Sequence, residues 1–288
     1  MHTRLKYVLI IGLVSLGLQT CENFYSSYNN VNSRKYRLEK ARNHIDNEEF
    51  TDAIAQLYPE WIDDVTNEEV AYYFAIAHAG RAGLNIIDLV SELAEDLSSK
   101  TIVEGISEFF EDADDEDISD IKEAIRIIEF TADEVNDRSA RMNFLALFAN
   151  WARIGIVLHR YSYSSNTLLT SNFDACKLSS SIGSARTGLP DNAVDEIMVS
   201  VPRIVELAAV ISGTGDAFDA LLGSSFSGLG SAPTEPIPCS ADSDAVLCLA
   251  TRSLINLGAD DGGIGLDTGN FAGDNAGPPI GTCDDTYN

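Results

Sequence analysis

The hexapeptide EFTDAI at residues 49–54 recurs as DIKEAI at residues 120–125. Both copies read acid, apolar residue, spacer, acid, alanine, isoleucine, and their alanines are 71 residues apart. This separation is close to twice a unit of ~35 residues, and self-similarity at that period is typical of arrays of stacked helical hairpins. The repeated hexapeptide therefore predicts a helical-repeat protein.

Helical periodicity extends on both sides of the hexapeptides, from Tyr36 to Tyr161. Apolar residues there recur at spacings of three and four, strand-like alternation is almost absent, and Pro59 is the only proline. Residues 66–69 match a capping box, in which a threonine caps a helix and a glutamate reaches back to it. Residues 141–160 are apolar on most sides, so we expect them to form the most buried helix.

The hexapeptides resemble the tetratricopeptide repeat, a helix–turn–helix unit of ~34 residues. In that family, an alanine lets helix B approach helix A, and an aromatic residue shortly before the alanine fills the gap. Phe50, Ala53 and Ala124 match this pattern, whereas Glu48 stands where the family usually has glycine. The resemblance covers residues 36–160 and implies a degenerate array, with a generic helical bundle as the alternative.

The C-terminal part of the chain is poorer in apolar residues. Residues 162–257 continue the same domain through a Ser- and Thr-rich connector, a helix that starts at Pro190-Asp191 and a last helix near residue 250. Residues 258–288 form a tail rich in Gly and Asp, with too few apolar residues to build a core. The expected fold class is all-α, with a repeat array or bundle at residues 36–161 and a disulfide-stapled helical C-terminal part.

The N-terminus carries an export signal that ends at Leu18-Gln19-Thr20-Cys21. Basic residues precede an apolar run from Tyr7 to Leu18, which is too short to span a bilayer comfortably. A cysteine directly after such a run resembles the lipobox of bacterial lipoproteins. The resemblance implies that residues 1–20 are a signal peptide and that Cys21 is acylated. An ordinary secretory signal cleaved after Gly17 is the alternative.

The charge of the chain limits its partners. It has 45 acidic and 19 basic residues, a formal net charge of −26, which repels nucleic acid and anionic headgroups. We therefore expect membrane contact through the acyl chains at Cys21 and not through a basic face. Residues 21–35 are a polar tether, and Glu22 in place of Asp favours the outer membrane, facing the periplasm. Five basic residues behind the anchor would contact anionic lipid or form a solvated helix face: Arg34, Lys35, Arg37, Lys40 and Arg42.

Four cysteines remain besides Cys21. An even number in an exported chain predicts two disulfides, and sequence alone allows three pairings. Pairing Cys239 with Cys248 closes the shortest loop and leaves Cys176 with Cys283. A helix that began at Ser240 would separate the first two by ~12 Å, which is too far, whereas a later start would permit the bond.

The sequence contains no established catalytic motif: HExxH, CxxC, P-loop, GxSxG and GxGxxG are all absent. We therefore expect a protein that is not an enzyme and needs no cofactor. One pattern resembles a calcium-binding EF-hand loop, with acids at positions 1, 3, 5, 9 and 12, namely Asp112, Asp114, Glu116, Asp120 and Glu123. Asp117 replaces the glycine of the sharp turn, and we favour the alternative that these acids start a helix.

The expected function is that of a lipid-anchored scaffold that binds an envelope protein or peptide. Its architecture is similar to the lipoprotein partners of TRAP-type substrate importers. The alternatives are an accessory solute-binding component that holds a small ligand between helices, and an envelope hydrolase with two facing acids. The oligomeric state is not determined by the sequence.

Three candidate contact residues fall in residues 66–83: Tyr72, His78 and Arg81. Tyr72 lies off the core stripe, so it is expected to contact a partner or to pack near Trp61. Arg81 is expected to pair with a partner's carboxylate or with an acid of this chain.

Overall fold

The computed structural model describes residues 33–89, 106–107, 109–110, 113–164, 167–168, 175, 188–212, 239, 248, 251–252 and 255. Several predictions concern positions outside these residues: the signal peptide, acylation of Cys21, the residues of the expected helices between 90 and 105, and the tail. Asp112, Cys176 and Cys283 also lie outside them.

The predicted all-α fold class is confirmed, because every long element in the described ranges is a helix. The helices are α2 (Arg34–Asp46), α3 (Phe50–Asp63), α4 (Glu68–Arg81), α7 (Asp115–Thr131), the 3-10 helix η1 (Val135–Asp137), α8 (Ala140–Ser162) and α9 (Asp191–Ser212). Strands β1 (Tyr163–Ser164) and β2 (Thr167–Leu168) form a two-residue antiparallel pair after α8. None of the described helices combines the length and the apolar character needed to cross a membrane.

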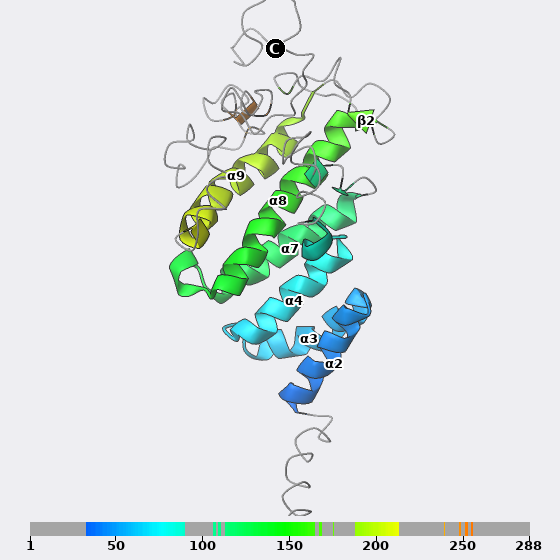
Figure 1. Ribbon diagram of the computed structural model, residues 1–288, viewed down its shortest axis with the longest axis vertical. Helices are drawn as coiled ribbons and strands as arrows, with labels where there is room; N and C mark the ends of the chain where they lie inside the picture. Colours follow the sequence, from blue (N-terminus) through cyan, green and yellow to red (C-terminus); the bar gives the residue numbers. More distant parts are fainter. Residues whose placement is uncertain are drawn as a thin grey trace, which may run out of the picture.

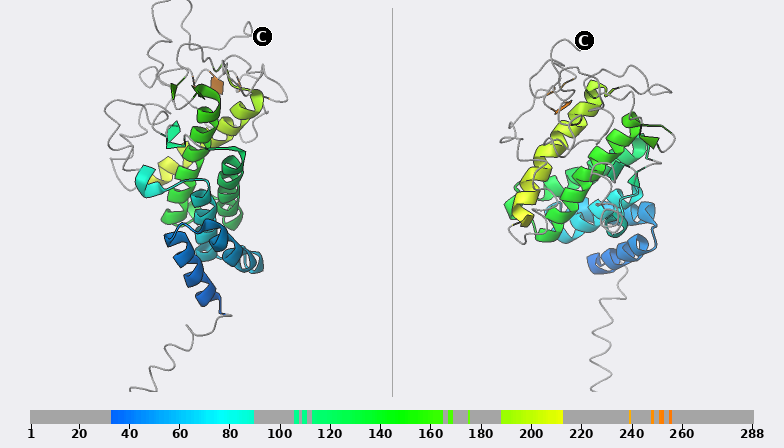
Figure 2. Two further views of the ribbon diagram at one scale, coloured as in Figure 1. Left: turned by 90° about the vertical axis from the view of Figure 1, so that its right-hand side faces the viewer. Right: turned by 45° about the horizontal axis from the view of Figure 1, so that its top comes forward.

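The helices stack in chain order along the long axis of the molecule (Figures 1 and 2). Each one packs on the next: α2 on α3, α3 on α4, α4 on α7, α7 on α8 and α8 on α9. Packing between consecutive helices is what a helical-repeat array requires, and an elongated bundle can show the same order among the described helices. Residues 90–105, between α4 and α7, lie outside the described part of the chain. The repeat therefore stays a prediction, whereas the helical stack is established.

The turn between α2 and α3 has a backbone feature that the sequence does not reveal. Ser33 caps α2 by accepting a hydrogen bond from the Tyr36 backbone N–H at 3.2 Å, so the last two residues of the expected tether are helical. Glu48, in the short turn, has φ of 61°, in the left-handed region. This is the position at which the tetratricopeptide family usually has glycine.

Helix caps follow the sequence signals closely, with one correction. The cap of α4 is Asn67 and not Thr66, because Asn67 Oδ1 accepts from the Val70 backbone N–H at 3.2 Å. The hydroxyl of Thr66 instead donates to Asp64 Oδ1 at 2.9 Å. Asparagine caps at least as well as threonine, so the helix starts one residue later than predicted.

Helix α8 is the centre of the core, as predicted, because every residue from Leu145 to His159 is buried. A Cβ at Gly155 would lie 2.4 Å from Ile106 Cγ2 and 3.0 Å from the Ile106 carbonyl oxygen, so glycine permits this close approach. Ala53 of α3 and Ala124 of α7 are both fully buried. Both α7 and α9 pack on this long apolar helix.

Candidate functional site

An open groove of about 780 Å³ lies between α3, α4 and α7. Its lining is amphipathic: α3, α4 and α7 contribute apolar side chains, and α4, α7 and α8 contribute charged ones. The residues of the lining are Ile54, Tyr58, Phe74, His78, Arg81, Asp115, Ile118, Ser119, Asp120, Lys122, Glu123, Ile125, Arg126, Glu129 and Arg153. Four of them are Lys or Arg and four are Asp or Glu, so the groove is formally neutral within a chain of net charge −26.

Asp120 of α7 is the central charge of the groove, and it is buried. Arg81 of α4 binds it in a bidentate manner, with Nε 2.5 Å from Oδ2 and Nη2 2.6 Å from Oδ1. His78, one turn earlier on α4, places Nδ1 2.9 Å from Oδ1. Two side chains of α4 thus converge on one carboxylate of α7 and fix the two helices relative to each other.

The electrostatic state of this cluster follows from burial and pairing. Burial tends to raise the pKa of Asp120, but the hydrogen bonds from Arg81 and His78 outweigh burial, and the net pKa is lowered. Burial lowers the pKa of His78, and the attraction of Asp120 does not fully offset it. At neutral pH, Asp120 is therefore ionised and His78 neutral. An ionised carboxylate only accepts, so His78 carries its proton on Nδ1.

A second ion cluster borders the groove where α7, α8 and α9 meet. Glu196 of α9 accepts from Lys122 Nζ and from Arg153 Nε, each at 2.6 Å. Burial tends to raise the pKa of Glu196, and these two cations lower it overall. The cations on this side of the groove are thus held by an acid of the next helix.

The α3 side of the groove is aromatic. The ring centroids of Tyr58 and Phe74 are 6.3 Å apart, those of Phe74 and Trp61 are 5.4 Å apart, and those of Trp61 and Phe130 are 6.1 Å apart. Arg126, which pairs with Glu123, lies over the Trp61 ring at 5.0 Å. The rings form a continuous series from Tyr58 of α3 to Phe74 of α4, back to Trp61 of α3 and on to Phe130 of α7. Phe74 and Trp61 are buried, and the two end rings are exposed.

The structure brings two of the three candidate contact residues into this groove. His78 and Arg81 line it, and Arg81 pairs with an acid of this chain, Asp120. Tyr72 is half-buried outside the lining, with its ring 5.3 Å from that of Tyr73. The guanidinium of Arg141 lies 4.7 Å above the Tyr72 ring.

The acids of the EF-hand-like pattern start a helix, as favoured from the sequence. Asp114 caps α7 and forms a capping box with Asp117. Glu116, Asp120 and Glu123 all lie inside α7, and Glu123 pairs with Arg126. A calcium loop wraps around its ion, which a continuous helix cannot do.

Three of the basic residues of α2 engage acids of this chain. Arg34 binds Asp63 and Asp64, Arg37 binds the buried Glu60, and the guanidinium of Arg42 bridges Glu39 and Glu69. These contacts match the expectation of a solvated helix face better than that of a lipid-contacting face.

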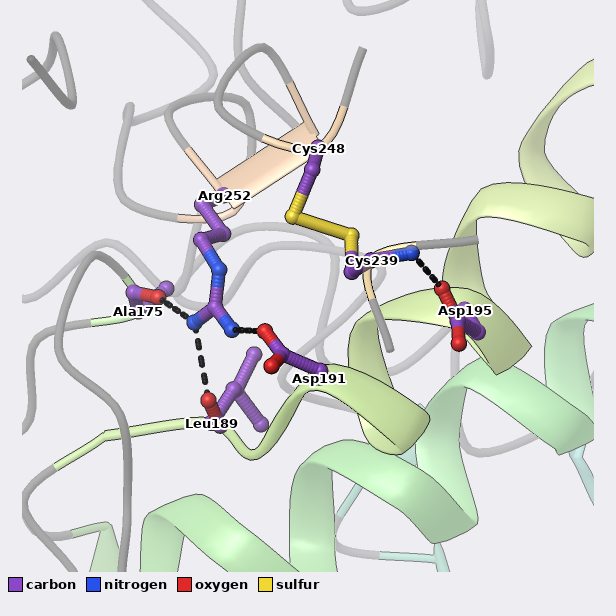
Figure 3. Close-up of a disulfide and its surroundings, with 7 residues drawn as sticks. All are labelled: Ala175, Leu189, Asp191, Asp195, Cys239, Cys248 and Arg252. Atoms are coloured by element: carbon purple, nitrogen blue, oxygen red, sulfur yellow. Dashed lines mark hydrogen bonds and ion pairs between the residues drawn. A yellow bond between two sulfur atoms is a disulfide. The ribbon is translucent and has the colours of Figure 1, made fainter. Parts of the chain in front are cut away.

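Cys239 and Cys248 form a disulfide with a Cα–Cα distance of 5.4 Å, which is the shortest-loop pairing (Figure 3). The Cys239 backbone N–H donates to Asp195 of α9. Beside it, the buried guanidinium of Arg252 donates to the carbonyl oxygens of Ala175 and Leu189 and to Asp191.

The sequence analysis did not single out Arg252, although one signal was present. Arg252 is the only basic residue after Arg203, so it stands alone in a long acidic segment. A buried arginine is almost always paired, but the packing of the chain, and not the local sequence, buries Arg252.

One group of side chains in the described ranges has the geometry to hold a metal ion. The ligand atoms of His44, Glu49 and Asp52 all lie within 4.8 Å of one another at the α2–α3 turn. His44 Nδ1 is 2.6 Å from Glu49 Oε2, and the group is largely exposed. Arg37 and Lys40 line the same shallow pocket as His44 and Asp52, and these positive charges oppose cation binding.

No protein-family model, curated protein or solved structure matches the chain.

Proposed function

We propose that the chain is a non-enzymatic helical scaffold that binds a segment of a partner protein in the groove between α3, α4 and α7. The observation that carries this proposal is the exposure of Tyr58 in the groove, beside the buried Phe74. Tyrosine gives a large contact area at low entropic cost, and it is enriched in protein-binding surfaces. The charged side chains of the groove are paired with one another or with neighbouring residues. They can make polar contacts with a partner, and no unpaired charge of this lining has to be desolvated on binding.

The charge pairing in the groove favours binding over acid–base chemistry. An envelope hydrolase would need two facing acids, one of them with a raised pKa. Asp120, the buried acid of the groove, instead faces two cationic or donor groups, and its pKa is lowered. A carboxylate held in this state is a weak base at neutral pH.

The shape of the groove favours a protein segment over a small solute. An accessory solute-binding protein would enclose most of its ligand, whereas this groove is open to solvent. Arg81, the arginine best placed to hold a ligand carboxylate, already binds Asp120 through two nitrogens. The sequence-derived alternative of a small ligand between helices is therefore the second choice.

We further propose that the scaffold acts in a bacterial envelope, anchored by lipid at Cys21 to the outer membrane and facing the periplasm. The lipobox-like run at residues 7–21 and the Cys239–Cys248 bond support this proposal, because disulfides persist in exported proteins. The similarity to lipoprotein partners of TRAP-type importers belongs to the same proposal.

The binding proposal is tested by capturing partners from detergent-solubilised envelopes on the immobilised protein. Tyr58→Ser should reduce the amount of captured partner about tenfold. The matched control is Ile87→Ser, because Ile87 is also an exposed apolar residue, at 78% exposure, but lies outside the groove lining. Equal capture by both variants would rule out the groove as the binding site, and circular dichroism would verify that both are folded.

A further inference from the structure

We infer that the partner segment is a cationic amphipathic helix, whose apolar face docks on a strip formed by Tyr58, Ile62 and Phe130. This inference rests on the proposed function and specifies the chemistry of the partner.

The strip is a cluster of large apolar side chains left open to solvent. Tyr58 and Ile62 are 52% and 54% exposed and lie one helical turn apart on α3, hence on one face. Phe130 of α7 is 59% exposed, and its ring contacts Trp61, which lies between Tyr58 and Ile62 in the sequence. Trp61 is buried, so it joins the exposed Phe130 to the α3 face from below, and a grouping of exposed apolar side chains of this kind marks an interaction site.

Acids border the strip at both helices. Asp63, with a side chain 77% exposed, follows Ile62, and Glu129 precedes Phe130. Exposed Asp133 and Glu134 come directly after α7. The chain as a whole has a net charge of −26, so a partner that carries Lys or Arg beside its apolar residues is attracted to this edge.

The three arginines near the strip do not reverse this balance, because they pair with at least five acids, Asp63 and Glu129 among them. Arg34 binds Asp63 and Asp64, Arg126 binds Glu123, and Arg203 binds Glu129 and Glu206. Tyr58 and Ile62 are one helical turn apart on the strip. The apolar residues of an amphipathic helix repeat at the same spacing, so such a helix can contact both side chains. The basic flank of that helix then lies along the acidic border.

The test uses the full mature chain and two synthetic amphipathic peptides of about 15 residues, four helical turns. Both peptides carry the same Leu positions, and their polar positions are Lys in one and Glu in the other. Fluorescence titration follows Trp61, which lies beside the strip. The Lys peptide should bind at least about tenfold more tightly than the Glu peptide, and its affinity should fall as salt is raised.

Variants separate docking on the strip from attraction to any acidic protein. Ile62→Ser and Phe130→Ser should each weaken binding of the Lys peptide by about tenfold, measured by calorimetry. The control variants Ile87→Ser and Val199→Ser remove apolar side chains that are 78% and 45% exposed elsewhere, and they should leave the affinity unchanged. Asp133→Asn with Glu134→Gln should weaken binding more than Asp46→Asn with Asp52→Asn.

The outcomes distinguish this inference from the proposed function. Equal binding of the Lys and Glu peptides would overturn the cationic partner, and unchanged affinity in the Ile62 and Phe130 variants would overturn the strip. Neither result would affect the capture experiment with Tyr58→Ser, because Tyr58 also lines the groove, whereas Ile62 and Phe130 lie outside its lining. If Tyr58→Ser loses capture but the Lys and Glu peptides bind equally, the groove remains the binding site and the cationic partner is rejected.

Discussion

Asp120 is the residue on which the geometry of the groove depends. Its carboxylate accepts from Arg81 and His78, which lie 39 and 42 positions earlier in the chain. The sequence left open whether Arg81 pairs with a partner's acid or with an acid of this chain. Acids are abundant in the sequence, so it did not identify which one. Only the packing of α4 against α7 selects Asp120.

We predict that Asp120→Ala lowers the free energy of unfolding by about 3 kcal/mol, because the buried His78 and the partly buried Arg81 lose their acceptor. Chemical denaturation at neutral pH measures this change. Asp115→Ala is the control, because Asp115 pairs with Arg160 but its side chain is 88% exposed. The control should change stability by less than about 1 kcal/mol. Similar losses in both variants would contradict a special role for Asp120.

We predict a loss of stability as pH falls below 6.5, caused by His78. Its folded-state pKa is below the ordinary 6.5, so the unfolded state binds more protons in the window between the two values. The contribution is complete above 6.5 and declines as pH decreases towards the folded-state pKa. His78→Asn keeps a donor at the position of Nδ1 but cannot titrate, so its denaturation midpoints from pH 8 to pH 5 should vary less. Parallel pH profiles for the two proteins would refute the assignment.

At the scale of elements, the repeated hexapeptides place their alanines inside α3 and α7, and the close helix contacts expected there stay a prediction. Ala53 and Ala124, the matched alanines, are both fully buried. Local signals also placed the start of α7 at its acids and the start of α4 within one residue. Thr66 and Asn67 could both cap α4, and the spacing pattern alone did not show that Asn67 is the cap.

We predict that Ala53→Leu lowers the free energy of unfolding by about 1–3 kcal/mol, because the larger side chain overpacks a site with no free space. Urea denaturation measures the effect. Ala55→Leu is the control on the same helix, since Ala55 is exposed and its substitution should change stability by about 0.5 kcal/mol or less. A neutral Ala53→Leu variant would mean that the alanine register does not mark a close helix contact.

At the scale of the whole molecule, the disulfide-linked corner attaches sequence-distant residues to the N-terminal part of α9. Cys239 reaches Asp195, and Arg252 gathers Ala175, Leu189 and Asp191 (Figure 3). The Cys239–Cys248 bond belongs to one of the three disulfide pairings that the sequence allowed. The structure adds the arginine beside the bond, which links three separate segments of the chain.

We predict that Arg252→Ala lowers the free energy of unfolding by about 3–5 kcal/mol, because two carbonyl groups and Asp191 lose a buried donor. Arg203→Ala is the control, because Arg203 also bridges acids but its side chain is 36% exposed. Denaturation with the disulfide intact isolates the contribution of the arginine. If both variants lose the same small amount, Arg252 does not organise this corner.

The sequence by itself determined the all-α class, the burial of α8 and the helical start at the acids of α7, because each follows from periodicity or capping within one segment. It also limited the disulfide to pairings that included the observed one. The tertiary structure alone decided the partners of Asp120, the groove, the exposed strip and the role of Arg252. These features join side chains from different helices, and their distances depend on how the helices pack, which no local pattern encodes.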